Sequence, residues 1–286
     1  MKIAQDDKLS ERLTKRHLPF GVHIGMHASQ GGPTNEKLLV QAGFVMLHDG
    51  DLRTTLWTAH KLTRDDVLRG KSMDKVKCFR RDKRLPAEHA AIKKDYEEPI
   101  FDRGHMAPDR DLRDDLVQQL NSYVLSNIAP QYDRFNSGIW NNLEKRGRDW
   151  AKAHETVYVT SGALFDFNPK DERDRDEKAA RMGSLHQTAR VAITSHFYKV
   201  FLRRCENQWC TIAFILEHHN GLGGGDTRQR LQEAIKPLAC IEGPAEITFH
   251  PELDRAEIRE SLDGNGWGLA SGTGSSDARR SSCAKG

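Results

Sequence analysis

The residues whose types and spacing could support chemistry are concentrated between positions 102 and 148. The stretch "DRGHMAP" at 102–108 places Asp102, Arg103 and His105 almost side by side. An imidazole titrates near neutral pH, so His105 could take a proton from water. Arginine holds phosphate oxygens through charge-assisted hydrogen bonds, a role open to Arg103 and to Arg148. Taken alone, these residue types leave two interpretations open: a tight surface turn, and part of an active site that hydrolyses a phosphate ester.

The segment that follows, "SNIAPQYDRFNSGIWNNLEKRGR" at 126–148, contains oxygen ligands suited to a metal ion. Asn136 could give its carbonyl oxygen to Mg²⁺, which prefers hard oxygen ligands and keeps most of its waters. Glu144, two helical turns further along, could orient those waters. Simpler interpretations stay open: Asn136 is also a good helix N-cap, and Glu144 and Arg148 have the spacing of an i,i+4 ion pair.

Three blocks stand in order in this part of the sequence: D-R-G-H at 102–105, S-N-I-x-P-Q at 126–131 and N-x-G-x-W-x-x-L-E at 136–144. Together they resemble the signature of the DNA/RNA non-specific endonucleases, a family of the ββα-metal (His-Me finger) superfamily. The resemblance extends more thinly over residues 40 to 253. It implies an α+β fold with a central, mostly antiparallel sheet, in which a β-hairpin presents His105 and the helix behind it presents Asn136.

The resemblance also implies an activity, that of a Mg²⁺-dependent, sugar-nonspecific endonuclease hydrolysing DNA and RNA, with Mn²⁺ able to replace Mg²⁺. His105 would be the general base, Asn136 the direct metal ligand and Glu144 a ligand through water. Arg103 and Arg148 would support the phosphate and the leaving group.

Supporting roles are expected for two neighbours of these residues. The resemblance implies that Asn127 holds His105 or its loop in place. Asp102 is expected to hold the hairpin or Arg103 rather than the metal.

A basic run, "KVKCFRRDKR" at 75–84, contains six Lys or Arg in ten residues. The interleaved Cys78 and Phe79 favour a strand with the basic side chains on one face, which could neutralise phosphates. The resemblance implies one upstream basic residue near the scissile phosphate. The candidates for it are Lys77, Arg80 and Arg81, and the register between them is left open.

Two alternatives to the enzyme remain open at this point. A catalytically silent module could keep the fold and the basic groove and only bind nucleic acid, and a phosphodiesterase of small nucleotides could use the same site. DNA and RNA, single- or double-stranded, are the expected partners. An inhibitor protein would protect a cell from this activity, and relatives form homodimers, so both are considered as further partners.

The elements that position these residues can be predicted from the apolar pattern. Strands are expected at 43–47 and 54–62, joined by an Asp-Gly hairpin, and at 156–165, 191–202 and 209–216. Helices are expected over 112–120, 137–154 and 227–235. Residues 1–16 are predicted to be a charged, solvated N-terminal arm, 17–255 the endonuclease domain, and 256–286 a disordered tail rich in Gly and Ser.

Three other stretches are predicted to be structural. "GLGGGD" at 221–226 lacks the Lys-Ser/Thr of a phosphate loop and indicates a flexible turn. "EHH" at 217–219 is typical of a polar strand end, because adjacent histidines on a strand point to opposite faces. The charged stretch at 168–183 indicates an exposed loop.

Composition limits the class of protein. Of the 286 residues, 30% are charged, the mean hydropathy is −0.70, and the net charge of +3 permits a polyanionic partner. No run approaches the roughly 20 apolar residues of a membrane helix. The start shows no secretory signal, which predicts a cytoplasmic protein or export by a non-classical route. The five cysteines form no CxxC pair, so reduced thiols are predicted and a zinc ribbon is not.

Overall fold

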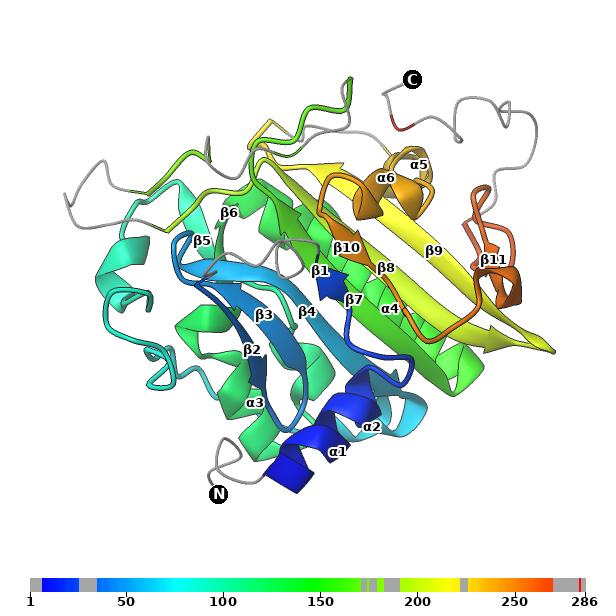
Figure 1. The fold of residues 1–286 in the computed structure, drawn as a ribbon, viewed down its shortest axis with the longest axis horizontal. Coiled ribbons are helices and arrows are strands. Elements are labelled where there is room, and N and C mark those ends of the chain that lie inside the picture. Colours follow the sequence, from blue (N-terminus) through cyan, green and yellow to red (C-terminus); the bar gives the residue numbers. More distant parts are fainter. Residues whose placement is uncertain are drawn as a thin grey trace.

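The structure is a computed structural model that describes residues 7–25, 35–170, 174, 179–182, 191–221, 226–269 and 283. The predicted Gly-rich turn at 221–226 and the predicted charged loop at 168–183 lie largely outside these residues. Within them, one large sheet runs through the centre of the molecule (Figure 1).

This central sheet has seven strands in the order β11-β9-β8-β7-β4-β3-β2. Neighbouring strands are antiparallel except β11 and β9, which run parallel. The predicted α+β class with a mostly antiparallel sheet is therefore confirmed. The strands are β2 (Glu36–Val40), β3 (Val45–Asp49), β4 (Thr54–Thr63), β7 (Thr156–Leu164), β8 (His196–Cys205), β9 (Gln208–Glu217) and β11 (Ile258–Glu260).

Strand β8 begins at His196, later than the predicted start at residue 191. The backbone before it bonds outside the sheet: the amide of Ala192 donates to Leu52 O, and the carbonyl of Val191 accepts from the amide of Met182. The apolar run predicts residues with a preference for strands. It does not show at which residue the backbone stops bonding to loops and begins to pair with the sheet.

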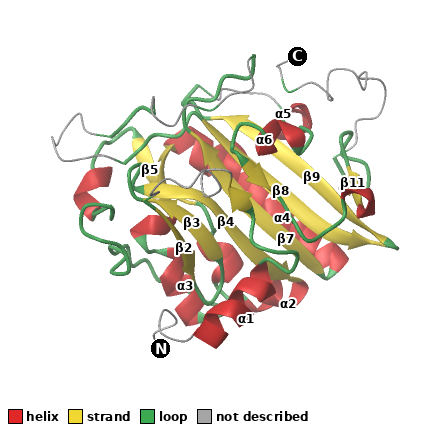
Figure 2. Cartoon of the chain, in the orientation of Figure 1, coloured by secondary structure: helices red, strands yellow, loops and turns green. Residues whose placement is uncertain are grey.

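Helices flank the sheet (Figure 2). They are α1 (Asp7–His17), α2 (Arg64–Arg69), α3 (Leu116–Ser122), α4 (Asn141–His154), α5 (Thr227–Glu233) and α6 (Ala239–Glu242), with short 3-10 turns at Lys93–Tyr96, Asp109–Leu112, Leu125–Asn127 and Arg255–Glu257. A small separate sheet pairs β1 (Ile24–Gly25) with β10 (Ile247–Thr248). Among the helices that the structure describes, none has the length and apolar character to cross a bilayer.

The two faces of the central sheet carry different cores because side chains alternate along a strand. On β8, Phe197 and Phe201 belong to a core that also contains Leu143 and Trp150 of α4. The intervening Tyr198 belongs to a second core, which Leu18, Ile241 and Phe249 complete. Helix α4 thus covers one face, while α1, α6 and β10 lie over the other (Figure 1).

Helix α4 follows its predicted pattern, whereas α3 does not. Leu143 and Trp150 of α4 are buried, as the apolar spacing predicts. In α3, Leu116 and Val117 are 49% and 57% exposed, and the buried residues are Gln119 and Ser122. Gln119 accepts from the amide of Val76 and donates to Asp74 O, so this helix turns its polar side inward to satisfy a neighbouring loop backbone.

Both predicted terminal segments need correction. The N-terminal arm is helical, but α1 is not simply solvated: Leu13 and His17 are buried, and His17 Nδ1 accepts from the amide of Lys61 on β4. The tail predicted to be disordered from residue 256 is folded over residues 256–269. It forms β11 and buries Trp267 and Leu269 to 2% and 0% exposure. A few anchored apolar residues outweigh the Gly- and Ser-rich composition here.

The prediction of reduced thiols is wrong for four of the five cysteines. Disulfides join Cys205 to Cys210 and Cys240 to Cys283, and Cys78 is free and exposed. Cys205 and Cys210 are diagonal neighbours across the β8–β9 hairpin, where Cys205 lies opposite Gln208 and Cys210 opposite Arg203, a proximity that depends on strand register rather than on a CxxC spacing.

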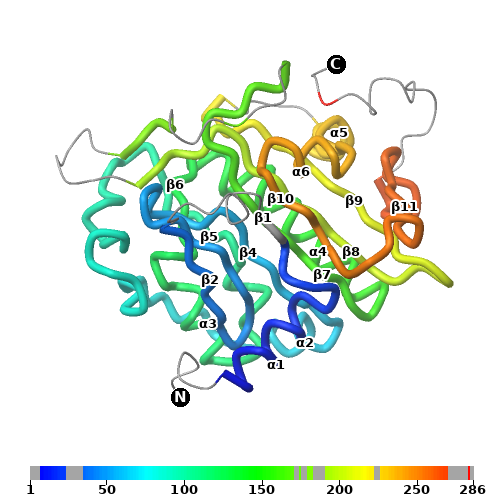
Figure 3. Tube along the Cα trace, viewed as in Figure 1, coloured from blue at the N-terminus to red at the C-terminus, as the bar shows by residue number. Residues whose placement is uncertain are grey.

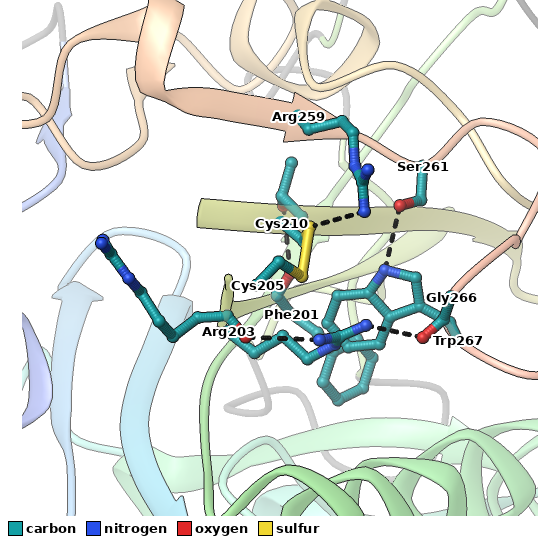
Figure 4. The surroundings of a disulfide bond; sticks show 10 residues. Phe201, Arg203, Cys205, Cys210, Arg259, Ser261, Gly266 and Trp267 are labelled. Carbon is teal, nitrogen blue, oxygen red and sulfur yellow. Dashed lines mark hydrogen bonds between the residues drawn. A yellow bond between two sulfur atoms is a disulfide. The ribbon is translucent and has the colours of Figure 1, made fainter. Parts of the chain in front are cut away.

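The ordered C-terminal segment covers the first of these disulfides (Figure 4). Arg259 donates to Cys210 Sγ at 3.3 Å, and Arg203 donates to Gly266 O at 2.6 Å. The indole of Trp267 lies under the Arg203 guanidinium, and its carbonyl accepts from Trp150 Nε1 at 2.7 Å. These contacts tie the C-terminal segment to β8, β9 and α4.

Candidate active site

The first two sequence blocks meet in a separate two-stranded sheet. Strand β5 (Phe101–His105) pairs antiparallel with β6 (Ile128–Tyr132), so that Asp102 lies opposite Gln131 and His105 opposite Ile128. The two strands are joined by a long excursion that includes α3, rather than by a tight turn. Beside them the chain from residue 70 to 100 runs along one end of the molecule (Figure 3).

Gly104 allows the two strands to approach closely. A Cβ atom at this position would meet Oε1 of the buried Gln131 at 2.1 Å, so a side chain larger than hydrogen would collide. The glycine of the D-R-G-H block is therefore required by packing against the second block.

Asn136 lies in a wide π-type turn, Phe135–Trp140, that leads directly into α4. Arg134, not Asn136, occupies the N-cap position, so the N-cap interpretation of Asn136 is wrong. Its Nδ2 donates to Asp102 Oδ2 at 2.9 Å. Its Oδ1 accepts no hydrogen bond from any residue that the structure describes, and the carboxamide oxygen is left for a ligand.

Asp102 therefore has a different partner from the expected hairpin backbone or Arg103. A carboxylate only accepts hydrogen bonds, so Asp102 fixes which end of the Asn136 amide turns toward it. The amide nitrogen faces Asp102 and the amide oxygen faces away.

His105 is partly buried between two aromatic rings. The ring centroids of Tyr123 and Phe79 lie 4.7 Å and 5.7 Å from that of the imidazole. Its Nε2 is buried and has no hydrogen-bond partner among the described residues. Burial lowers the pKa of His105 to about 4, which the neighbouring Asp109 opposes, so the imidazole is neutral at pH 7.

Asn127 is fully buried and braces the loop after His105. Its Oδ1 accepts from the amide of Ala107 at 2.9 Å, and its Nδ2 donates to Ala107 O and Ser122 O. The backbone also links the two, because the amide of Met106 donates to Asn127 O. This placement fits the expected supporting role.

The predicted residues His105, Asn136, Glu144 and Arg148 line one pocket of about 300 Å³. Seven further residues line this pocket, and no individual role was proposed for any of them from the sequence: Lys75, Pro108, Asp109, Arg110, Arg113, Ser137 and Asn141. Arginines and a lysine outnumber carboxylates around this pocket, which suits an anionic ligand.

Glu144 and Arg148 do not form the i,i+4 ion pair that their spacing suggests. Arg148 Nη1 donates instead to Asp111 Oδ1 at 2.7 Å. Burial raises the pKa of Glu144, and the ammonium group of Lys199 on β8 opposes this shift. Lys199 is 1% exposed and donates to Ser161 Oγ at 2.7 Å.

Asp111 and Lys199 were missed in the sequence. Lys199 could have been found from its place inside the apolar run "HFYKVFL" at 196–202, because a lysine on a buried strand needs a partner. No comparable pattern marks Asp111.

Arg103 lies beside the pocket rather than in its wall. It is on the same side of β5 as His105, and its guanidinium carbon is 5.5 Å from the centre of the Phe79 ring. Lys77 Nζ is 5.6 Å from the same ring. Phe79 thus gathers two cations next to the imidazole.

The basic run at 75–84 is extended but is not the predicted strand; its one bridge joins Arg80 to Val124. Arg80 is held by Leu120 O and by Asn121 Oδ1, and Arg81 points to Leu85 O. Of the three predicted candidates, Lys77 is the one near His105, while Lys75 of the same run lines the pocket. Phe79 anchors the segment and takes the place of strand pairing.

His218 has a structural role, as expected for a polar strand end. Its Nε2 accepts from the amide of Tyr132 at 2.8 Å, and its other ring nitrogen lies 2.6 Å from Thr194 O. Within the described parts of the chain, no three His, Cys, Asp or Glu side chains converge to hold a metal. A metal in the pocket would rely on Asn136 Oδ1 and water, a donor set that suits Mg²⁺.

Comparison with known proteins gives consistent matches over most of the chain. The family model "DNA/RNA non-specific endonuclease" matches residues 26–256. Mitochondrial endonuclease G of Bos taurus is 34% identical over 82% of this chain and 76% of its own length, and that of Homo sapiens 35% over 80% and 74%. Nuclease C1 of Cunninghamella echinulata var. echinulata is 30% identical over 77% and 85%.

A solved structure has the same fold. A chain from the crystal structure of the EndoG/EndoGI complex superposes with a TM-score of 0.70, covering 86% of this chain and 94% of that one, at 22% identity. The sequence-based resemblance to this family is thus confirmed.

Proposed function

Because the chain belongs to the DNA/RNA non-specific endonuclease family, we propose that it hydrolyses phosphodiester bonds of DNA and RNA in this pocket with the help of Mg²⁺. One observation carries the proposal. The unengaged oxygen of Asn136, oriented by Asp102, lines the same pocket as a neutral imidazole.

His105 is the general base. At neutral pH its imidazole is unprotonated, and the residue lines the pocket beside Asn136 and Glu144. Tyr123 and Phe79 hold the ring, and the backbone bonds to Asn127 fix the loop behind it. A base held this way takes the proton of an attacking water without reorientation.

Mg²⁺ would be held directly by Asn136 and through water by Glu144. The ion would neutralise charge on the phosphate and on the leaving oxygen. The protein's part is to present one neutral oxygen, which Asp102 orients, and one carboxylate that accepts from water. Mn²⁺ has similar ligand preferences and should replace Mg²⁺.

Cations around the pocket hold the phosphate chain. Arg148 faces the reacting phosphate from α4, and Arg103 and Lys77 lie beside His105. Lys75 and Arg110 extend the positive surface at the pocket wall. Phosphate contacts carry no sequence information, so cleavage of single and double strands and of both sugar types is expected.

The test is cleavage of supercoiled plasmid and of total RNA with Mg²⁺, Mn²⁺ or EDTA. The proposal expects cleavage of both substrates, lost with EDTA. His105→Ala should lower the rate about 10²–10⁴-fold, as loss of a general base does. His154→Ala, which removes an exposed histidine at the end of α4, serves as the matched control. Binding without cleavage would instead support a silent module, and preference for a short nucleotide a small-molecule phosphodiesterase.

An inhibitor protein and a homodimer are further proposals. The solved structure with the same fold is that of an endonuclease bound to its inhibitor, and a pocket rich in arginine and lysine is a natural target for an acidic partner. Native mass spectrometry of the purified protein would give the oligomeric state directly.

A further inference from the structure

Asp111 connects three elements behind the pocket. It belongs to the 3-10 turn Asp109–Leu112, and its Oδ1 accepts from Arg148 Nη1 of α4 at 2.7 Å. Its Oδ2 lies 3.2 Å from His60 Nε2 of β4. The side chains of His60, Asp111 and Arg148 are 0%, 4% and 10% exposed. Both carboxylate oxygens are therefore committed to partners from different elements.

From its position on α4, Arg148 has two carboxylates within reach as possible ion-pair partners, those of Glu144 and Asp111. Glu144 lies one turn earlier on the same helix face, at the spacing of an i,i+4 pair. Asp111 reaches it from the adjacent turn and is more deeply buried than Glu144. Asp111 forms a short, charge-assisted bond of 2.7 Å and is itself held by His60, and Arg148 takes Asp111 as its partner.

His60 keeps Asp111 in this orientation. Its Nε2 faces Asp111, and its Nδ1 is buried without a partner in the described part of the chain. The carboxylate only accepts, so Nε2 carries the hydrogen and the imidazole donates. With one oxygen held by His60, the Asp111 side chain cannot rotate away from Arg148 without losing both bonds.

We propose that Asp111, locked by His60, is a positioning residue that holds Arg148 away from Glu144. The inference rests on the proposed function of the pocket. It has two consequences for the same residues. Arg148 keeps its remaining N–H donors for a phosphate, and Glu144 keeps its oxygens for the waters of a bound metal. Without Asp111, Arg148 would pair with Glu144. The Arg148 donors would then not be available to the phosphate, nor the Glu144 oxygens to the metal-bound waters.

The variant Asp111→Asn keeps the shape of the side chain and removes its charge. We expect Arg148 to pair with Glu144, and Mn²⁺ binding to the purified protein, measured by electron paramagnetic resonance, to weaken about 10-fold, as for other residues that orient metal ligands. His60→Leu, which removes the donor, should weaken Mn²⁺ binding in the same direction. His60→Gln, which keeps an N–H donor, should restore it.

A double-mutant cycle isolates the cause. If Asp111 acts by keeping Arg148 from Glu144, then Asp111→Asn should change Mn²⁺ affinity by less than about 2-fold when Glu144→Gln is already present. The matched control is His48→Leu, which removes another fully buried histidine, bonded to His89 O. It should lower the melting temperature without changing Mn²⁺ affinity.

Two results would overturn the inference. One is a folded Asp111→Asn protein that binds Mn²⁺ as tightly as wild type. The other is equal weakening by Asp111→Asn with and without Glu144→Gln. Should Asp111→Asn fail to fold, the contrast between His60→Leu and His60→Gln decides, because equal Mn²⁺ affinities of those two contradict the proposal. Cleavage of DNA by the wild type is a separate result, so the proposed function can stand when this inference fails.

Discussion

The two faces of the central sheet bury titratable groups in different ways. Against α4 the sheet buries ions: Lys199 and Arg203 of β8, with the pair of Asp111 and Arg148 beside them. On the opposite face the buried titratable side chains among the described residues include Tyr198 and three histidines, His17, His23 and His250. Burial lowers the pKa of all three, so they are neutral at pH 7.

The difference follows from what each face supports. A buried charge is destabilising unless a partner compensates it, so a chain that only needs a stable core gains nothing from burying ions. The α4 face lies directly behind the pocket, where the proposed function requires charges directed at a phosphate and a metal. The opposite face uses rings, as in the 5.0 Å contact of His23 with Trp57, and holds the sheet without ions.

The strongest test of this contrast is Arg148→Met. It leaves Asp111 buried without its cation, and loss of one partner of a buried pair costs about 3–5 kcal/mol of unfolding free energy. Urea denaturation measures it. The matched change on the other face, His23→Phe, removes the bond to Thr160 and the long bond, 3.5 Å, from the amide of His250, and should cost about 1–2 kcal/mol. If the two variants lost the same unfolding free energy, the two faces would not differ in how strongly their buried titratable groups depend on their partners.

A second test uses pH. The pKa of His250 is about 4 in the folded protein, against about 6.5 when unfolded, so below pH 6.5 the unfolded state binds a proton that the folded state excludes. Its contribution to stability is complete above pH 6.5 and falls by about 3 kcal/mol as the pH drops to 4. His250→Asn removes this dependence, and asparagine tolerates the backbone φ of 52° at this position.

Stability of both proteins at pH 7 and pH 4.5 gives the comparison. The His250→Asn protein should lose less stability than wild type over this interval. An identical loss in the two proteins would assign the acid sensitivity to other buried groups, such as His17.

A third test exchanges the pair at the pocket. Asp102→Asn lets the Asn136 amide turn over, and Mn²⁺ affinity should fall about 10–100-fold. The double variant Asp102→Asn/Asn136→Asp places a donor at 102 and a carboxylate at 136, so an oxygen faces the pocket again. Mn²⁺ titration should show affinity recovering in the double variant. A double variant as weak as Asp102→Asn would contradict the orienting bond.

The smallest expected effect separates two basic residues of one segment. Lys77→Gln should weaken DNA binding a few-fold and reduce the slope of log affinity against log salt by about 1, because one phosphate contact is lost. Arg80→Gln should leave that slope unchanged, since Arg80 is held by Leu120 O and Asn121. Fluorescence anisotropy with a labelled oligonucleotide across salt concentrations measures both.

Prediction from the sequence succeeded where residues act through local pattern. The three blocks and the residues that follow them singled out His105, Asn136, Glu144 and Arg148, which the structure brings to one pocket, and the regular apolar spacing predicted α4. The catalytic roles of the four residues stay predictions. It failed where the deciding partner is distant in the chain. Nothing near Arg148 shows that Asp111, 37 residues earlier, will displace Glu144 as its partner.

The same limit explains the other errors. The pairing of Cys205 with Cys210 depends on the register of β8 and β9, and the inward turn of Gln119 depends on a loop backbone that needs partners. The basic run at 75–84 suggested a strand, but it pairs with another segment only at Arg80, and Phe79 packs against a neighbouring core cluster. In each case tertiary contacts override a local preference.

Strand β11 has a consequence for how the protein behaves in solution. It pairs with β9 through Ile258, Arg259 and Glu260 and so covers the end of a sheet edge. An uncovered edge offers unpaired backbone groups to other chains and promotes aggregation. A shortened protein ending at residue 255, the boundary that composition suggests, would open this edge at Trp209–Thr211. We therefore expect a protein shortened at residue 255 to self-associate more than the full chain.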